Sequence, residues 1–215
     1  MNLTQKFKKL EDLDSYCKEN GLNILDILIK ATPYRAPTFK KAIDFLNKVK
    51  PNTLIETGTA RGRFDINLPS IVGDGASTVI FALWCRENNA KIYTVDINKT
   101  CIDNCRLNIN ALGLSEYVEF VISDSIKFLE EVNEKDIKFL YLDSYDFDYN
   151  DPLPSQMHHL KEYLAVKNKL SSNCGILIDD CGLPHGGKGL LLEKELVKDN
   201  YKLVLNGYQH MYLKI

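Results

Sequence analysis

The chain has 215 residues, 45% of them hydrophobic, and its 27 basic and 29 acidic residues give a formal net charge of −2. The sequence has no basic stripe of the kind that nucleic-acid-binding proteins carry, and its apolar runs are too short to cross a bilayer. The stretch MNLTQKFKKLEDLD at the N-terminus is charged and lacks the apolar segment of a signal peptide, so we expect a cytoplasmic protein. This composition suits one α/β domain with a helical appendage.

The first part of the chain is expected to be a helical N-terminal extension over 1–50, followed by a single domain over 51–215. In APTFKKAIDFLNKVK (36–50) the apolar residues recur at helical spacing. Pro37 suits the first turn of a helix, and Pro51 ends the region. The extension could cap a pocket or form a contact between copies in a homo-oligomer, and both alternatives stay open.

From residue 51 the pattern changes to short apolar runs separated by amphipathic segments. The segments are expected to be helices, at 76–89, 99–112, 125–133, 154–171 and 188–199. The runs are expected to be strands: NTLIETG (52–58), KIYTVDI (91–97), YVEFVIS (117–123), IKFLYLD (137–143), CGILIDD (174–180), YKLVLN (201–206) and QHMYLKI (209–215). Such alternation is typical of βαβ units, and Asn206-Gly207 predicts a hairpin between the last two runs. We therefore predict a seven-stranded, mostly parallel sheet with an antiparallel last strand and helices on both faces.

Acidic residues end several of these runs. Ligands of open parallel sheets bind beyond the carboxyl ends of the strands, and much charge along one edge requires a ligand or a metal ion. The first run is also followed by glycines, in IETGTARG, and a second cluster, GDGAST (73–78), precedes the next helix. Asp96 lies 21 residues after Gly75, a spacing at which an acid can hold ribose hydroxyls. Tight turns alone would explain the glycines, but together with Asp96 they favour a nucleoside-type ligand.

The motifs IETGTARG, YTVDIN, VISDS and FLYLDS, with the terminal hairpin, resemble those of the class I S-adenosylmethionine-dependent methyltransferases over residues 40–215. The resemblance implies a Rossmann-like fold and S-adenosylmethionine as the cofactor. It implies that Asp96 holds the ribose and that Asp124 and Ser125 flank the adenine. The loop 63–74 splits the family's compact glycine motif, and a lid is one role for it. The candidates for the cofactor site are Glu56, Gly58, Thr59, Gly62, Ser77, Asp96, Asp124, Ser125 and Asp143.

Three further carboxylates, Asp143, Asp179 and Asp180, end the fourth and fifth strands, which are expected to be neighbours. Converging carboxylates repel unless a cation neutralises them, and hard oxygen ligands favour Mg²⁺ or Ca²⁺. Alternatively, one acid caps a loop or faces solvent. The pattern resembles the metal-dependent small-molecule O-methyltransferases of the catechol, macrolide-sugar and cephalosporin types. In those enzymes the ion lowers the pKa of the substrate hydroxyl and orients it. The catechol type has a lysine base after the fourth strand, whereas DSYDFDYNDP has none.

The candidates for catalysis are Asp143, His158, His159 and His185. The two adjacent histidines lie about 100° apart on a helix, so at most one faces the edge of the sheet. His185 follows the acidic pair in a loop and is a candidate base. In the same loop HGGKG (185–189) is not a Walker motif, and Lys188 could meet a substrate anion or be solvated. Arg35 could reach the pocket from the N-terminal region.

The sequence therefore predicts O-methylation of a small-molecule or sugar hydroxyl by S-adenosylmethionine, assisted by a divalent ion. No nucleic-acid or membrane partner is expected. One alternative is a non-catalytic domain that binds a nucleoside or a partner protein. Another is an NAD(P)-dependent oxidoreductase, which the missing G-x-G-x-x-G pattern disfavours.

Overall fold

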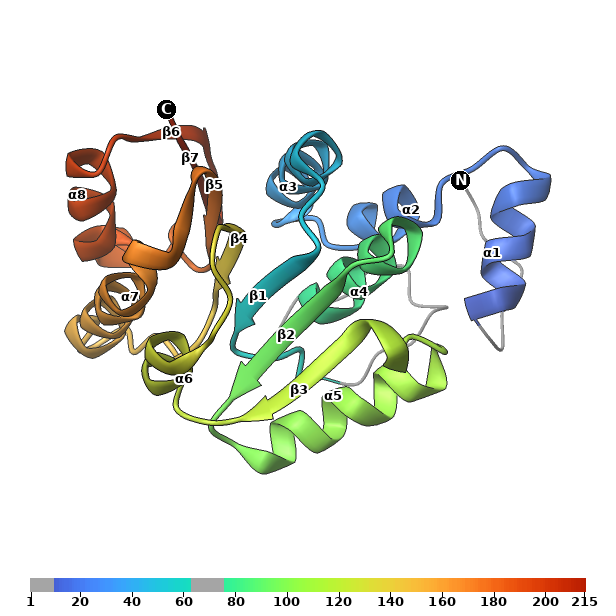
Figure 1. Ribbon diagram of the computed structural model, residues 1–215, viewed down its shortest axis with the longest axis horizontal. Helices are drawn as coiled ribbons and strands as arrows, with labels where there is room; N and C mark the ends of the chain where they lie inside the picture. The colour runs from blue at the N-terminus through green and yellow to red at the C-terminus, as the bar shows by residue number, and fades with distance from the viewer. Residues whose placement is uncertain (1–9, 63–75) are drawn as a thin grey trace.

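The structure is a computed structural model that describes residues 10–62 and 76–215. Three helices come first, and strands then alternate with helices before a final hairpin (Figure 1). The elements are α1 (Leu10–Glu19), α2 (Ile24–Lys30), α3 (Ala36–Val49), β1 (Thr53–Thr57), α4 (Ser77–Asn88), β2 (Lys91–Asp96), α5 (Lys99–Ala111), β3 (Val118–Ile122), α6 (Ser125–Glu131), β4 (Ile137–Leu142), α7 (Leu153–Val166), β5 (Leu170–Ile178), α8 (Leu190–Lys198), β6 (Tyr201–Asn206) and β7 (His210–Lys214).

All seven strands form one sheet in the order β3-β2-β1-β4-β5-β7-β6. The pairs among β1 to β5 are parallel, and β7 runs antiparallel to both β5 and β6. This confirms the predicted mostly parallel sheet with a reversed last strand. The strand order changes direction between β1 and β4, and the carboxyl ends of strands on either side of such a point form the usual ligand crevice.

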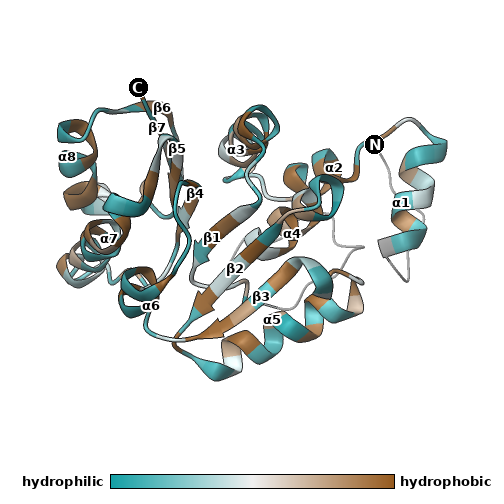
Figure 2. Cartoon of the chain, in the orientation of Figure 1, coloured by the Kyte–Doolittle hydropathy of each residue, from teal (hydrophilic) through white to brown (hydrophobic). Residues whose placement is uncertain are grey.

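The two faces of the sheet bury separate apolar clusters. Leu54 of β1 belongs to the cluster that also holds side chains of α1 to α5. The next residue, Ile55, belongs to the cluster of α6, α7 and α8. The same alternation recurs in β4, because successive side chains of a strand point to opposite faces. Helices therefore cover both faces, with α6, α7 and α8 together at one side (Figure 1), and α5 carries both apolar and polar residues (Figure 2).

Local signals explain where several helices begin and end. Pro37 lies in the first turn of α3, and Lys50, which follows the last residue of the helix, has a left-handed conformation with φ of 43°. The side chain of Asn98 accepts a hydrogen bond from the backbone of Thr100 at 2.9 Å and caps α5. Asp124 caps α6 in the same way. These caps confirm the predicted starts of the helices near residues 99 and 125.

One boundary differs from the prediction. The helix expected to run to residue 171 ends at Val166, and β5 begins at Leu170 rather than near 174. Leu170 pairs with Ile137 of β4. This pairing lengthens β5 at its start, and the sequence around residue 170 does not indicate it.

The first three helices are not isolated from the sheet. The apolar face of α3 packs into the same cluster as β4, β5 and β7. The boundary between a helical extension over 1–50 and a domain over 51–215 therefore stays a prediction. The predicted loop 63–74 lies outside the described residues. Among the helices that the structure describes, none has the length and apolar character needed to cross a membrane.

Candidate active site

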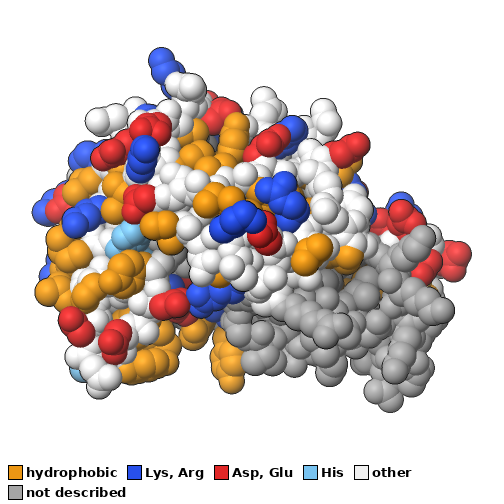
Figure 3. Space-filling view, turned by 90° about the horizontal axis from the view of Figure 1, so that it is seen from below, with side chains coloured by type: hydrophobic (Ala, Val, Ile, Leu, Met, Phe, Trp, Pro, Cys, Tyr) orange, Lys and Arg blue, Asp and Glu red, His pale blue; other side chains and the backbone are white. Residues whose placement is uncertain are grey.

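A cavity of about 940 Å³ lies at the carboxyl ends of the central strands. This volume is within the range that takes a cofactor or a small substrate. Figure 3 views the molecule from the side to which the arrowheads of β1, β2 and β3 point in Figure 1, and acidic and basic side chains lie next to one another there. The described residues that line the cavity are Arg35, Gly58, Thr59, Arg61, Gly62, Val95, Asp96, Ile97, Asn98, Cys101, Asp124, Ser125, Asp143, Ser144, Tyr145, Asp146, His158, Asp179, Asp180, Lys188 and Tyr208.

Gly58 allows the ends of β1 and β4 to approach each other at the base of this cavity. Its φ is +80°, a conformation that side chains disfavour. A Cβ at this position would lie 2.5 Å from the carbonyl oxygen of Asp143. The backbone N–H of Gly58 also donates to the carbonyl of Val95 at 2.8 Å, which ties the turn to β2. The glycine predicted from the IETGTARG motif therefore has a steric reason to be there.

Two of the cofactor candidates lie behind the cavity. Glu56 is fully buried, and its carboxylate accepts hydrogen bonds from the hydroxyls of Ser77, Thr78 and Thr94 at 2.5, 2.6 and 2.7 Å. These contacts join β1, α4 and β2. Neither Glu56 nor Ser77 is part of the described lining, because their polar groups contact each other instead.

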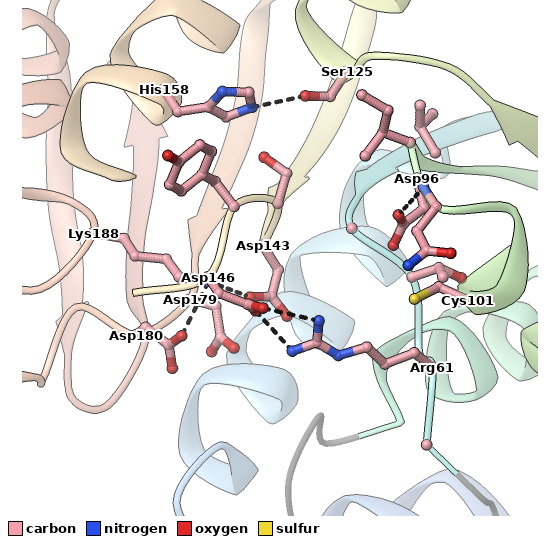
Figure 4. A pocket seen from close by; sticks show the side chains of 18 of the residues that line it. Arg61, Asp96, Cys101, Ser125, Asp143, Asp146, His158, Asp179, Asp180 and Lys188 are labelled. Carbon is pink, nitrogen blue, oxygen red and sulfur yellow. Dashed lines mark hydrogen bonds and ion pairs between the residues drawn. The ribbon is translucent and has the colours of Figure 1, made fainter. Parts of the chain in front are cut away.

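The remaining cofactor candidates line the cavity, and Asp96, Asp124 and Ser125 form the side near β2 and β3. Asp96 is the last residue of β2 and accepts a hydrogen bond from the backbone N–H of Asn98 at 2.7 Å. Asp124 is exposed and caps α6. In Figure 4, Asp96 and Cys101 lie across the cavity from Asp179 and Asp180, so the cavity has two chemically different sides.

The three candidate histidines have different environments. Nε2 of His158 lies 3.0 Å from the hydroxyl of Ser125, and this histidine lines the cavity (Figure 4). His159 is fully buried outside the lining, and its Nδ1 lies 2.7 Å from the carbonyl of Ser155. That carbonyl can only accept, so Nδ1 carries the proton. His185 is exposed and also lies outside the described lining.

The buried position of His159 predicts a loss of stability in mild acid. Burial lowers the pKa of His159 to about 4 from its ordinary 6.5. Between these two values the unfolded chain binds a proton that the folded protein does not bind, so stability falls as the pH falls. In His159→Gln, the decrease in the free energy of unfolding between pH 7 and 4.5 should be smaller than in the wild type by about 2–3 kcal/mol. Urea unfolding at both pH values measures this, and equal decreases in the two proteins would contradict it.

The three predicted metal ligands come together on the other side of the cavity, where their oxygen atoms lie within 4.8 Å of one another. Two cations already contact them. The guanidinium of Arg35 donates to the oxygens of Asp179 at 2.7, 3.0 and 3.2 Å. Nζ of Lys188 lies 2.9 Å from Asp143 and 3.0 Å from Asp180 (Figure 4). We call these three aspartates the acid cluster.

The charges of the acid cluster and its cations depend on one another. Burial alone would lower the pKa of Lys188, but the carboxylates, Asp143 foremost, raise it above its ordinary value. Burial would raise the pKa of Asp179, and Arg35 holds it below its ordinary value. The pKa of Asp143 is raised by burial and by the charge of Asp179. Lys188 and Arg35 are therefore cations at neutral pH, and Asp179 is an anion.

The donor set of the acid cluster consists of hard oxygens, which suits Mg²⁺ or Ca²⁺. The surroundings suit such an ion poorly, because Lys188 is only 2% exposed and already bridges two of the three carboxylates. An ion that took this place would leave the ammonium group buried without its partners, which is costly.

The pairing of Lys188 with Asp143 and Asp180 has no signal in the sequence. The sequence leaves Lys188 open between a substrate anion and a solvated position, and it indicates no role for Tyr208 or Arg61. Tyr208 donates to Asp180 at 2.5 Å and carries the guanidinium of Arg35 over its ring. Arg61 forms an exposed ion pair with Asp146 at 2.7 Å at the cavity. Their only signal in the sequence is their proximity to the strand ends, which many residues share.

Comparison with known families matches residues 72–181 to a methyltransferase domain. Among curated proteins no sequence matches. Solved structures with the same fold include a methyltransferase from Podospora anserina bound to S-adenosylhomocysteine, with 16% identity, a TM-score of 0.61 and coverage of 95% of this chain and 94% of that one. An O-methyltransferase from Bacillus cereus, also bound to S-adenosylhomocysteine, has 15% identity, a TM-score of 0.60 and coverage of 100% and 94%. A methyltransferase from Geobacter sulfurreducens has 14% identity, a TM-score of 0.56 and coverage of 95% and 86%.

At these identities the structural likeness concerns the fold, and it agrees with the strand order and the reversed β7 described above. The family match spans more than half of the 215 residues. The chain therefore belongs to the methyltransferase-domain family and has the fold of the class I S-adenosylmethionine-dependent methyltransferases.

Proposed function

We propose that the protein transfers the methyl group of S-adenosylmethionine to a hydroxyl oxygen of a small molecule or a sugar. The observation that carries this proposal is the two-sided cavity. One side has the carboxylates and hydroxyl of Asp96, Asp124 and Ser125, and the other has the acid cluster with its two cations. Its volume of about 940 Å³ leaves room for a cofactor and a small acceptor together.

The side near β2 and β3 is assigned to the nucleoside. A carboxylate at the end of the second strand, such as Asp96, can accept hydrogen bonds from both ribose hydroxyls. Ser125 and the exposed Asp124 provide polar groups for the edge of the adenine. Gly58 lets the ends of β1 and β4 approach each other and also lines the cavity, so the methionine part can lie beside its backbone. Thr59 and Gly62, which also line the cavity, belong to this side.

The acid cluster is assigned to the region of the sulfonium and the acceptor. When all three carboxylates are ionised, the acid cluster with Arg35 and Lys188 carries a net charge of −1, which favours a positive sulfonium nearby. In the transfer, the acceptor oxygen attacks the methyl carbon while the carbon–sulfur bond breaks and the hydroxyl proton leaves. Asp143 and His158 are the catalytic candidates that line the cavity, and both can take that proton. The remaining contribution of the protein is to position the two reactants.

Participation of Mg²⁺ or Ca²⁺ stays a prediction from the sequence. Asp143, Asp179 and Asp180 would hold the ion, which would lower the pKa of the acceptor hydroxyl. The contacts of Lys188 and Arg35 with the same carboxylates count against this form of the reaction. A purely binding domain and an oxidoreductase gain no support from the cavity or from the family match.

Calorimetric titration of S-adenosylhomocysteine into the protein tests the proposal. We expect saturable binding with a micromolar dissociation constant, and an absence of binding would overturn the proposed function. A set of phenols and glycosides, each paired with its amine analogue, then tests the acceptor atom. Mass spectrometry should detect one added methyl group on hydroxyl compounds, whereas methylation of amines alone would refute an oxygen acceptor.

A further inference from the structure

We propose that Lys188 takes the place of a divalent cation in the acid cluster and that its ammonium group faces the acceptor oxygen during methyl transfer. This inference rests on the proposed function, because it concerns the same cavity. The reaction would then need no metal ion. The ammonium group of Lys188 would supply the positive charge that stabilises the acceptor oxygen as it loses its proton.

The contacts of Lys188 are those of a central cation. Its Nζ lies 2.9 Å from Asp143 and 3.0 Å from Asp180, and the third carboxylate, Asp179, is held by Arg35 at 2.7 Å. All three aspartates therefore have a cationic partner. An ammonium group has three N–H donors, and two of them meet these carboxylates in the described part of the chain. Lys188 also lines the cavity, so the third donor can serve an acceptor oxygen.

The loop before α8 is built to bring Lys188 to this position. Gly187 has a φ of +55°, and a Cβ there would lie 2.0 Å from the backbone oxygen of Asp180. The backbone N–H of Lys188 donates to that same oxygen at 3.2 Å. The side chain of Gln156 on α7 donates to the carbonyls of His185 and Gly187 at 3.1 and 3.0 Å. Hydrogen bonds to Asp180 and from Gln156 therefore fix the backbone on which the buried side chain of Lys188 is placed.

The balance of charge also favours the lysine over an added ion. With Arg35 and Lys188 in place and all three carboxylates ionised, the acid cluster has a net charge of −1. A Mg²⁺ ion bound to Asp143 and Asp180 would lie about 2.0–2.1 Å from their oxygens, in the space that Nζ takes between them. Both cations cannot occupy this space. Without Lys188, three ionised carboxylates and Arg35 would leave a charge of −2, which matches a divalent ion.

The test is titration of Mg²⁺ into the wild type, Lys188→Ala and the control Lys194→Ala, whose side chain is exposed on α8. The wild type and the control should show no saturable binding of Mg²⁺. Lys188→Ala should gain a saturable site for one ion, at least about 100-fold tighter than the weakest binding that the titration detects, because one buried positive charge is removed. Its melting temperature should also rise with Mg²⁺, whereas those of the other two proteins should not change.

Saturable binding of Mg²⁺ to the wild type would overturn the proposal, and so would a Lys188→Ala protein that gains no site. Should this variant fail to fold without Mg²⁺, recovery of its fold on adding Mg²⁺ would support the proposal and continued failure would count against it. Titration of S-adenosylhomocysteine into the same wild-type protein separates the two claims. Binding of both ligands would leave the proposed function and remove this inference. Binding of neither would remove the proposed function, and with it the part of Lys188 in methyl transfer, and would leave only the replacement of the metal ion by Lys188.

Discussion

Replacing Arg35 by Met is expected to lower the free energy of unfolding by about 3–5 kcal/mol, because it leaves a buried carboxylate without its partner. Asp179 has a side chain that is 1% exposed, and the guanidinium of Arg35 contacts it at 2.7 Å. For a chain of this size the loss corresponds to a decrease in melting temperature of about 6–20 °C. Urea unfolding at pH 7 measures the free energy directly.

Two further variants make this result specific. Arg61 also forms an ion pair at 2.7 Å, with Asp146, but the two side chains are 52% and 75% exposed. Arg61→Met should therefore cost at most about 1 kcal/mol. The double variant Arg35→Met/Asp179→Leu removes both charges and should recover most of the stability lost in Arg35→Met. A single Arg35→Met variant as stable as Arg61→Met would show that the buried pair does not stabilise the fold.

Replacing Asp96 by Ala is expected to weaken the binding of S-adenosylhomocysteine by about 100-fold or more. The physical reason is the loss of two hydrogen bonds from ribose hydroxyls to a charged acceptor, each contributing about 1.5–3 kcal/mol. Calorimetric titration of both proteins under the same conditions measures the ratio. The acid cluster lies on the other side of the cavity, so Mg²⁺ titrations should be the same for this variant and the wild type (Figure 4).

The matched control is Asp103→Ala on α5. Asp103 is an acidic residue near the same strand end, but it forms an exposed ion pair with Lys99 and is not part of the described lining. Its removal should leave the affinity for S-adenosylhomocysteine within about twofold of the wild type. Equal affinities of Asp96→Ala and Asp103→Ala would refute the assignment of Asp96 to the ribose.

Much of the fold could be predicted because its signals are local. Runs such as KIYTVDI and IKFLYLD are short and apolar, and they were expected to be strands where β2 and β4 lie. Pro37 and Asn206-Gly207 indicated the start of a helix and a hairpin, which α3 and the β6–β7 pair confirm. The start of β5 at Leu170 does not follow from the local pattern, because it depends on pairing with Ile137 of β4.

The sequence likewise predicts one part of the site and leaves the other to the tertiary structure. That the carboxylates of β4 and β5 would meet follows from the sequence, since adjacent parallel strands end at the same edge of the sheet. Which cation neutralises them does not follow. Arg35 is 144 positions away from Asp179, and Lys188 is 45 positions away from Asp143. Only the tertiary structure decided these partners, because a turn at Gly187 and the packing of α3 bring distant charges together, and no periodicity along the chain records such contacts.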